Sequence, residues 1–236
     1  MKIELFTYTY NDEDFLPFFL DYYEPIVDKM TFIDSGSTDN TLEIIYDHGH
    51  NIIETGLTWW DWDRLHEMKK SVWKGSEYDL IFFPDLDEIF YRPNLKQWLE
   101  QNRFPIYQME GFQMVSRSFP KKGSNILEIN KGAPFSLYNK FTIFSPKADI
   151  EFPNAHVIGE TKDRVDRFNI KCLHYKFIGI DSLMKRARTI IDRVPPGSYC
   201  HHIKGNILTV MTKMVRSREE YLEEIAEWEG KAKVVI

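Results

Sequence analysis

Three acidic residues follow an apolar run near the middle of the chain. Residues 80–83 are apolar, and Pro84 separates them from Asp85-Leu86-Asp87-Glu88. Carboxylates placed this closely repel one another unless a cation compensates them. Such oxygen ligands suit Mg²⁺ or Mn²⁺, which proteins usually hold with one or two carboxylates and the phosphates of a substrate. The segment is therefore a candidate site for a divalent metal and a diphosphate. The alternative is a solvated acidic loop beside a basic partner such as Arg92.

A second acidic segment comes earlier, at Asp34-Ser35-Gly36-Ser37-Thr38-Asp39. It follows an expected strand and precedes an expected helix, as a ligand-binding turn would. The alternative is ordinary turn chemistry, in which Gly36 relaxes the backbone and Asp39 or Asn40 caps the helix. By itself this segment is a weak signal.

The elements around both segments follow a regular alternation. Strands are expected at residues 3–9, 30–33, 52–54 and 80–83, and helices at 15–23, 41–48, 62–73 and 94–99. This alternation predicts a doubly wound α/β sheet. Because run 80–83 is apolar on both faces, we expect it in the middle of a parallel sheet, with its acidic residues at the carboxyl edge where such sheets bind ligands.

The second half of the chain has a different pattern. From about residue 105, short strand-like runs alternate with turns that contain Gly and Pro, which indicates a more antiparallel region. Strands are expected at residues 107–115, 141–144 and 170–175, and helices at 182–193 and 219–228. Pro195-Pro196-Gly197 is the best candidate for a break between parts of the chain.

Composition limits the functional classes. The 236 residues, 43% of them hydrophobic, suffice for one core, and the net charge of −6 argues against nucleic acid as a partner. Only Cys172 and Cys200 are present, without paired spacing, so a reducing, cytoplasmic setting is expected. Apolar runs are too short to span a membrane, and the N-terminus lacks a signal-peptide core. We therefore expect a soluble protein, at most peripheral to a membrane.

Together these segments resemble the family 2-like glycosyltransferases of the GT-A fold. Three segments carry the resemblance in order, residues 10–23, 32–41 and 81–88, and it extends weakly to Cys172-Leu173-His174-Tyr175. The resemblance implies a single GT-A domain, with a mainly parallel sheet flanked by helices and a smaller antiparallel region on the acceptor side. The expected division is a catalytic domain at 1–195, split into a nucleotide-sugar-binding half at 1–104 and an acceptor half at 105–195, and a helical C-terminal extension at 196–236.

The resemblance also implies an activity. It is the metal-dependent, inverting transfer of a sugar from a UDP-, GDP- or dTDP-sugar to a hydroxyl of a glycan, lipid-linked or other acceptor. Two other functions stay open from the residues, a non-catalytic nucleotide-sugar-binding module and a metal-dependent phospho- or nucleotidyltransferase. The basic stretch Lys185-Arg186-Ala187-Arg188 is expected to be a solvated helix face, with an anionic acceptor site as its functional alternative.

Site residues follow from the resemblance by position. Asp87 is expected to bind Mn²⁺ or Mg²⁺ and so to act in catalysis, Asp85 to face the ribose or the metal, and His174 to complete the metal shell. The alternative for His174 is a core histidine. Because Ser35 replaces the second Asp of the commoner acidic turn, Asp34 is left to contact the base. The nucleotide-sugar-binding set is Thr7, Tyr8, Glu13, Asp34, Lys69, Asp85, Leu86 and Asp87, with a solvated position on a helix surface as the alternative for Lys69.

Two further predictions concern the acceptor and the sugar. An inverting transfer needs a general base, and Glu160 is the first choice because His156 is near it in a turn-like segment; a surface glutamate is the alternative. The indole cluster Trp59-Trp60-Asp61-Trp62-Asp63 suits a sugar or acceptor pocket, with Trp59, Trp60 and Asp61 as its residues. A hydrophobic anchor beneath a loop explains the same cluster equally well.

Overall fold

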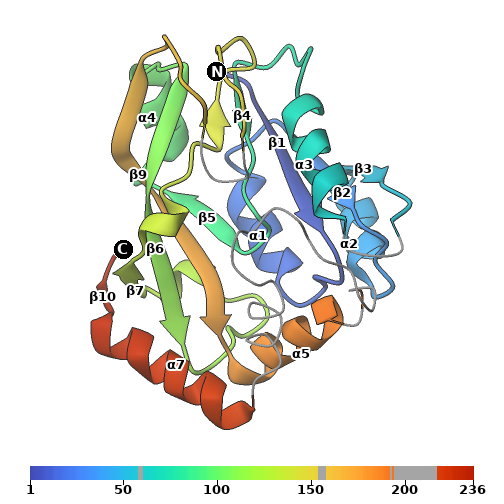
Figure 1. Cartoon of the computed structure of the whole chain (residues 1–236), viewed down its shortest axis with the longest axis vertical. Helices are drawn as coiled ribbons and strands as arrows, with labels where there is room; N and C mark the ends of the chain where they lie inside the picture. Colours follow the sequence, from blue (N-terminus) through green and yellow to red (C-terminus); the bar gives the residue numbers. More distant parts are fainter. Residues whose placement is uncertain (58–60, 154–157, 192, 194–216) are drawn as a thin grey trace.

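The computed structural model of this chain describes residues 1–57, 61–153, 158–191, 193 and 217–236. Within these parts ten strands form one sheet, in the order β10-β7-β6-β8-β4-β1-β2-β3, and β9 and β5 are joined to it through β6. Figure 1 shows the parallel strands and their helices on one side, and the longer β6 and β9 on the other. The predicted α/β architecture, a parallel sheet with an antiparallel region, is confirmed.

The parallel half holds the first four strands. β1 (Ile3–Thr9) pairs in parallel with β2 (Lys29–Asp34) and β4 (Leu80–Phe82), and β2 pairs in parallel with β3 (Asn51–Glu54). The helices between them are α1 (Leu16–Tyr23), α2 (Thr41–Asp47) and α3 (Trp62–Ser71). Successive strand residues point to opposite faces, so Leu5 and Phe82 enter one hydrophobic cluster while Phe6 and Ile81 enter another. The sheet is therefore covered on both faces.

The prediction for β4 is right about burial and wrong about one neighbour. Its three residues are buried, but the strand pairs in parallel only with β1, and antiparallel with β8 (Ile143–Phe144) on its other side. A continuous apolar run reports that both faces are covered, and it carries no information about the direction of the adjacent strand. β4 therefore marks the boundary between the two halves of the sheet.

The second half is built on two long strands that pair with each other in parallel. These are β6 (Ile106–Ser116) and β9 (Val165–Ile178), the latter longer at both ends than the sequence predicts. β5 (Glu88–Tyr91) pairs antiparallel with β9, and β7 (Lys131–Pro134) with β6. The other elements here are α4 (Leu95–Gln101) and two short 3₁₀ helices, Ile126–Glu128 and Ser136–Tyr138.

The described C-terminal residues pack against this half (Figure 1). α5 (Ile180–Ile191) and α7 (Arg218–Lys231) contact each other, and Tyr221 and Ile225 of α7 pack with Val115 of β6. β10 (Lys233–Val234) pairs with β7. The proposed break at 195–197 lies outside the described residues, and the division at 195/196 stays a prediction. Among the described residues no helix combines the length and apolar character needed to cross a membrane.

Candidate metal and diphosphate site

Strand pairing places the acidic segment beside His174. The segment leaves the carboxyl end of β4, and its last residue, Glu88, begins β5 opposite His174 of β9. The Tyr175 amide donates to the Asp87 carbonyl at 2.8 Å, which fixes the segment against β9. As a result the His174 Nε2 atom lies 3.4 Å from Asp87 Oδ2, and both side chains are buried.

The hydrogen bonds of Gln113 determine which nitrogen of His174 carries its proton. Gln113 Nε2 donates to the carbonyls of Met114 and His174, both at 2.9 Å, so its Oε1 can only accept. His174 Nδ1 lies 2.8 Å from that oxygen and must therefore be the donor. Burial lowers the pKa of His174, although Asp87 opposes the shift, so the imidazole is neutral near pH 7. Its Nε2 then presents a lone pair.

A nitrogen lone pair and a carboxylate oxygen thus face each other at 3.4 Å. Two electron-rich atoms at this distance are stabilised by a cation between them. Neighbouring ligands of an octahedral ion stand about 3 Å apart when metal–ligand distances are about 2.1 Å. A metal-bound histidine also commonly donates its other N–H to a fixed acceptor, as His174 does to Gln113. The donor set fits a divalent cation, and the assignment of Asp87 and His174 as its ligands stays a prediction.

A buried lysine that sequence reasoning missed compensates the other two carboxylates. Lys140 Nζ lies 2.6 Å from Asp85 Oδ2 and also contacts Glu88, and its side chain is only 1% exposed. Burial by itself would lower the pKa of Lys140, but Asp85 and Glu88 raise it well above its ordinary value. Burial raises the pKa of Glu88 to about 7, against the opposing effect of Lys140. The compensating cation expected from the sequence is therefore supplied, for these two acids, by the protein itself.

Two further cationic side chains reach the segment. Arg186 Nη1 donates to Asp87 Oδ2 at 3.0 Å, so the expectation of a solvated face at 185–188 is wrong for this residue. Lys69 is buried, with its Nζ 5.0 Å from the Phe83 ring centre, and burial lowers its pKa to about 8. Although burial alone would raise the pKa of Asp85, Lys140 and Lys69 hold it at about 2. Asp85 is therefore ionised at any pH near neutral.

Within residues 34–39, the Asp34 carboxylate is satisfied by its own turn. The Asp34 carboxylate accepts from the amides of Gly36 at 2.8 Å and Ser37 at 3.0 Å, and Gly36 has a positive φ of 90°. Asn11 joins this turn to the loop after β1, because its Oδ1 accepts from the Thr38 amide at 2.7 Å. The ordinary turn chemistry expected of Asp34 is thus present, and its contact with a base stays a prediction.

The other residues predicted to bind the nucleotide-sugar are either buried or already paired with protein groups. Thr7 and Leu86 are buried. The Tyr8 hydroxyl donates to the Leu65 carbonyl, and its ring lies 5.4 Å from that of Phe83. Glu13 accepts from the Asn40 side chain at 2.8 Å and pairs with Lys185, whose side chain is 50% exposed, as expected of a solvated helix face. None of these contacts tests the predicted binding roles.

The structure does not test the predicted sugar pocket or the predicted general base. Trp59 and Trp60 lie outside the described residues, as does His156. Asp61 caps α3, where its Oδ1 accepts from the Arg64 amide at 3.0 Å. Glu160 is exposed in the segment before β9, as in the alternative of a surface glutamate. Its catalytic role stays a prediction.

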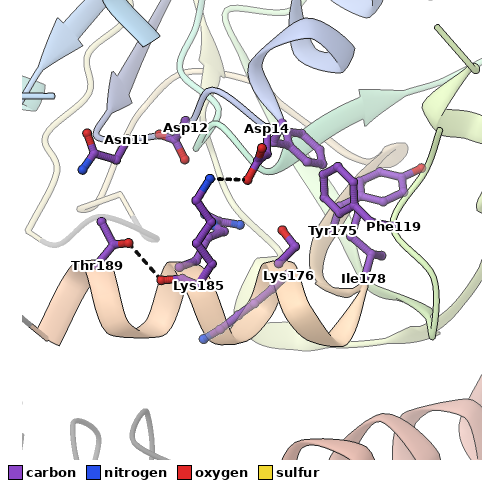
Figure 2. A pocket seen from close by; sticks show the side chains of 12 residues that line it. Asn11, Asp12, Asp14, Phe119, Tyr175, Lys176, Ile178, Lys185 and Thr189 are labelled. Atoms are coloured by element: carbon purple, nitrogen blue, oxygen red, sulfur yellow. Dashed lines mark hydrogen bonds and ion pairs between the residues drawn. The ribbon is translucent and has the colours of Figure 1, made fainter. Parts of the chain in front are cut away.

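A pocket adjoins the site on the side of Arg186. Figure 2 shows side chains of the loop after β1 facing those of α5 and the end of β9, with Lys185 reaching Asp14 at 2.7 Å. Asp12 lies in this wall, and burial raises its pKa to about 6 although Arg186 opposes the shift. The pocket is lined by Asn11, Asp12, Asp14, Phe15, Phe119, Tyr175, Lys176, Ile178, Ser182, Lys185, Arg186 and Thr189.

Comparison with protein-family models and with curated proteins finds no match. Solved structures match part of the chain. Glucosyl-3-phosphoglycerate synthase from Mycobacterium tuberculosis, crystallised with Mn²⁺, UDP and glucosyl-3-phosphoglycerate, is 20% identical over 48% of this chain and 44% of that chain, with a TM-score of 0.35. The same enzyme with phosphoglyceric acid is 19% identical over 49% of this chain and 45% of that chain, with a TM-score of 0.37. A further mycobacterial protein is 19% identical over 49% of this chain and 42% of that chain, with a TM-score of 0.36. Because the chain spans less than half the length of these proteins, function has to be inferred from its own residues.

Proposed function

We propose that this protein is a divalent-metal-dependent glycosyltransferase that takes its sugar from a nucleoside-diphosphate sugar. One observation carries the proposal: the neutral His174 directs its Nε2 lone pair at the Asp87 carboxylate, at the carboxyl edge of the sheet. Two protein ligands leave most of an octahedral shell to phosphate oxygens and water, as is usual for Mg²⁺ and Mn²⁺. A bound ion of this kind neutralises a diphosphate leaving group.

The chain's own residues have separate roles in this proposal. Asp87 and His174 hold the ion, and Gln113 keeps the His174 lone pair directed at it. Arg186, which contacts Asp87 from α5, is placed to donate to phosphate oxygens at the same edge. Lys140 contacts both Asp85 and Glu88 and so anchors the acidic segment at the end of the strand. UDP-, GDP- and dTDP-sugars remain the candidate donors and a hydroxyl the acceptor.

The test is a thermal-stability screen of nucleoside diphosphates and their sugars with and without Mn²⁺, followed by product analysis. A ligand at a hundred times its dissociation constant stabilises by about 2.7 kcal/mol, which such a screen detects. Sugar on an acceptor with free nucleoside diphosphate supports the proposal. Binding without turnover favours a non-catalytic module, and transfer of a phosphoryl or nucleotidyl group favours the other enzyme class. If no nucleotide binds with Mn²⁺ present, the proposal is wrong.

The decisive variant is Asp87→Asn, which keeps the shape and removes the charge. We expect turnover to fall roughly 100-fold or more, because metal stabilisation of a leaving group is worth several kcal/mol and each 1.4 kcal/mol is about tenfold. The matched control is Asp79→Asn, at the opposite end of β4, where Asp79 accepts from the Lys2 amide. The control should turn over at the wild-type rate; equal losses in both variants would contradict the assignment of Asp87.

A further inference from the structure

A cluster of two histidines and a glutamate lies outside the candidate site, where α1 ends beside the turn between α2 and β3. Glu24 is the C-cap of α1, His48 is the C-cap of α2, and His50 directly precedes β3. In the described parts of the chain, no other group of three His, Cys, Asp or Glu side chains brings its ligand atoms within 4.8 Å of one another. Sequence reasoning gave this cluster no role.

Both imidazoles converge on one carboxylate oxygen. His48 Nδ1 lies 2.7 Å from Glu24 Oε1, and His50 Nε2 lies 2.9 Å from the same atom. Gly49 makes this convergence possible, because its φ of 74° ends α2 in a left-handed turn. In that turn the Gly49 amide donates to Tyr46, so the histidines on either side of Gly49 face the same carboxylate. Two imidazole nitrogens thus lie within 2.9 Å of one carboxylate oxygen.

The electrostatic setting favours a cation at this point. The C-terminal ends of α1 and α2 meet here, and each carries the negative end of a helix dipole. The Glu24 carboxylate adds a full negative charge. All three side chains are accessible, with exposed fractions of 37% for Glu24, 40% for His48 and 17% for His50. An ion could therefore enter from solvent without any rearrangement of the core.

The donor set selects the kind of ion. Two imidazoles and one carboxylate suit Zn²⁺ and its transition-metal neighbours, whereas Mg²⁺ and Ca²⁺ prefer oxygen ligands alone. Zinc–ligand distances of about 2.0–2.2 Å place neighbouring ligand atoms about 3.3 Å apart in a tetrahedron. The observed separations of 2.7 and 2.9 Å would need to grow by about half an ångström, within the freedom of exposed side chains.

We propose that Glu24, His48 and His50 form a zinc site that joins the end of α1 to the turn between α2 and β3, with water as the fourth ligand. This site is separate from the one at Asp87 and is independent of the proposed transferase function. Since β1 and β2 carry the loops at the carboxyl edge, a clamp between the helices that follow these strands would stabilise the same half of the sheet.

The test is a Zn²⁺ titration of metal-free protein by calorimetry, repeated with Co²⁺ to record the absorption bands of tetrahedral coordination. Asp87→Asn serves as the background, so that the candidate transferase site does not contribute. We expect about one ion per chain, a rise in Tm with Zn²⁺, and a loss of at least about tenfold in affinity in each of Glu24→Gln, His48→Gln and His50→Gln. Changes to outer-shell groups alone already cost about that much.

Two controls make the outcome unambiguous. The sequence also contains the adjacent pair His201-His202, and a double His201→Gln/His202→Gln variant should bind Zn²⁺ as the background does. Circular dichroism of the metal-free variants shows whether each one folds, so a folding defect is not mistaken for a lost ligand. The proposal is overturned if the Asp87→Asn protein binds no Zn²⁺, or if His48→Gln and His50→Gln leave the affinity unchanged.

Discussion

Residues 34–39 and 85–88 look alike in the sequence and differ in their electrostatics. Both place carboxylates where a strand of the parallel half ends. In the first segment Asp34 is satisfied by the amides of its own turn, Gly36 and Ser37. In the second, every carboxylate is paired with a side chain from a distant part of the chain. The Asp34 carboxylate therefore needs no distant partner, whereas the segment at 85–88 depends on cationic side chains that the fold supplies.

The largest effect that would separate the two segments comes from Lys140. In Lys140→Met, Asp85 and Glu88 lose their buried partner, and we expect the free energy of unfolding to fall by about 3–5 kcal/mol. Urea denaturation measures this loss. Adding Glu88→Gln to the same variant should restore part of the stability, because one buried charge is then gone. A loss below about 1 kcal/mol in the single variant would mean that the pairing contributes little.

Asp12 lies between the two segments, and its titration sharpens the contrast. Its pKa is about 6 in the folded protein against an ordinary 3.8, with burial as the main cause. Between these values the folded state binds more protons than the unfolded state, so stability falls as pH rises. Relative to Asp12→Asn, the wild type should lose at most about 3 kcal/mol between pH 4 and pH 7, at about 1.4 kcal/mol per pKa unit. Parallel curves of unfolding free energy against pH for the two proteins would contradict this.

Gln113 tests whether the acidic segment at 85–88 is oriented for a metal. Gln113→Met removes the acceptor of the His174 Nδ1 proton and leaves both proposed ligands in place. We expect Mn²⁺ affinity to fall about 10- to 100-fold, as for other groups that orient a metal-binding histidine. Electron paramagnetic resonance of free Mn²⁺ measures the affinity, and circular dichroism checks the fold. An unchanged affinity would show that the Gln113 contact does not set the tautomer.

The smallest effect is expected at Asp34. Asp34→Asn keeps an oxygen acceptor for the Gly36 and Ser37 amides and removes only the charge. The free energy of unfolding should change by less than about 1 kcal/mol, since the bonds from the two amides are kept and change only from charged to neutral. Thermal unfolding measures the change. A loss as large as that of Lys140→Met would erase the distinction between the two segments.

Much of the fold follows from local sequence patterns. The strands at the start of the chain, the helices after them and the acidic strand end were all predictable, because apolar periodicity and turn residues act over a few positions. The direction of β8 beside β4 was not, since an apolar run is compatible with either direction. Extra length in β9 was missed for a related reason. Its polar residues Asp166 and Arg167 pair with Tyr107 and Gln108 of β6, although the local pattern of this part of β9 is not apolar.

The candidate site divides in the same way. The sequence alone determined that Asp85, Asp87 and Glu88 stand together at the end of an apolar strand, because their spacing is local. Only the tertiary structure decided what surrounds them. Lys140 is 55 residues from Asp85, Gln113 is 61 from His174, and Arg186 is 99 from Asp87. No short-range pattern encodes contacts of that separation, and the sheet pairing of β5 with β9 brings His174 to Asp87. The sequence alone therefore determines the charge of the acidic segment, and the fold determines which side chains pair with it.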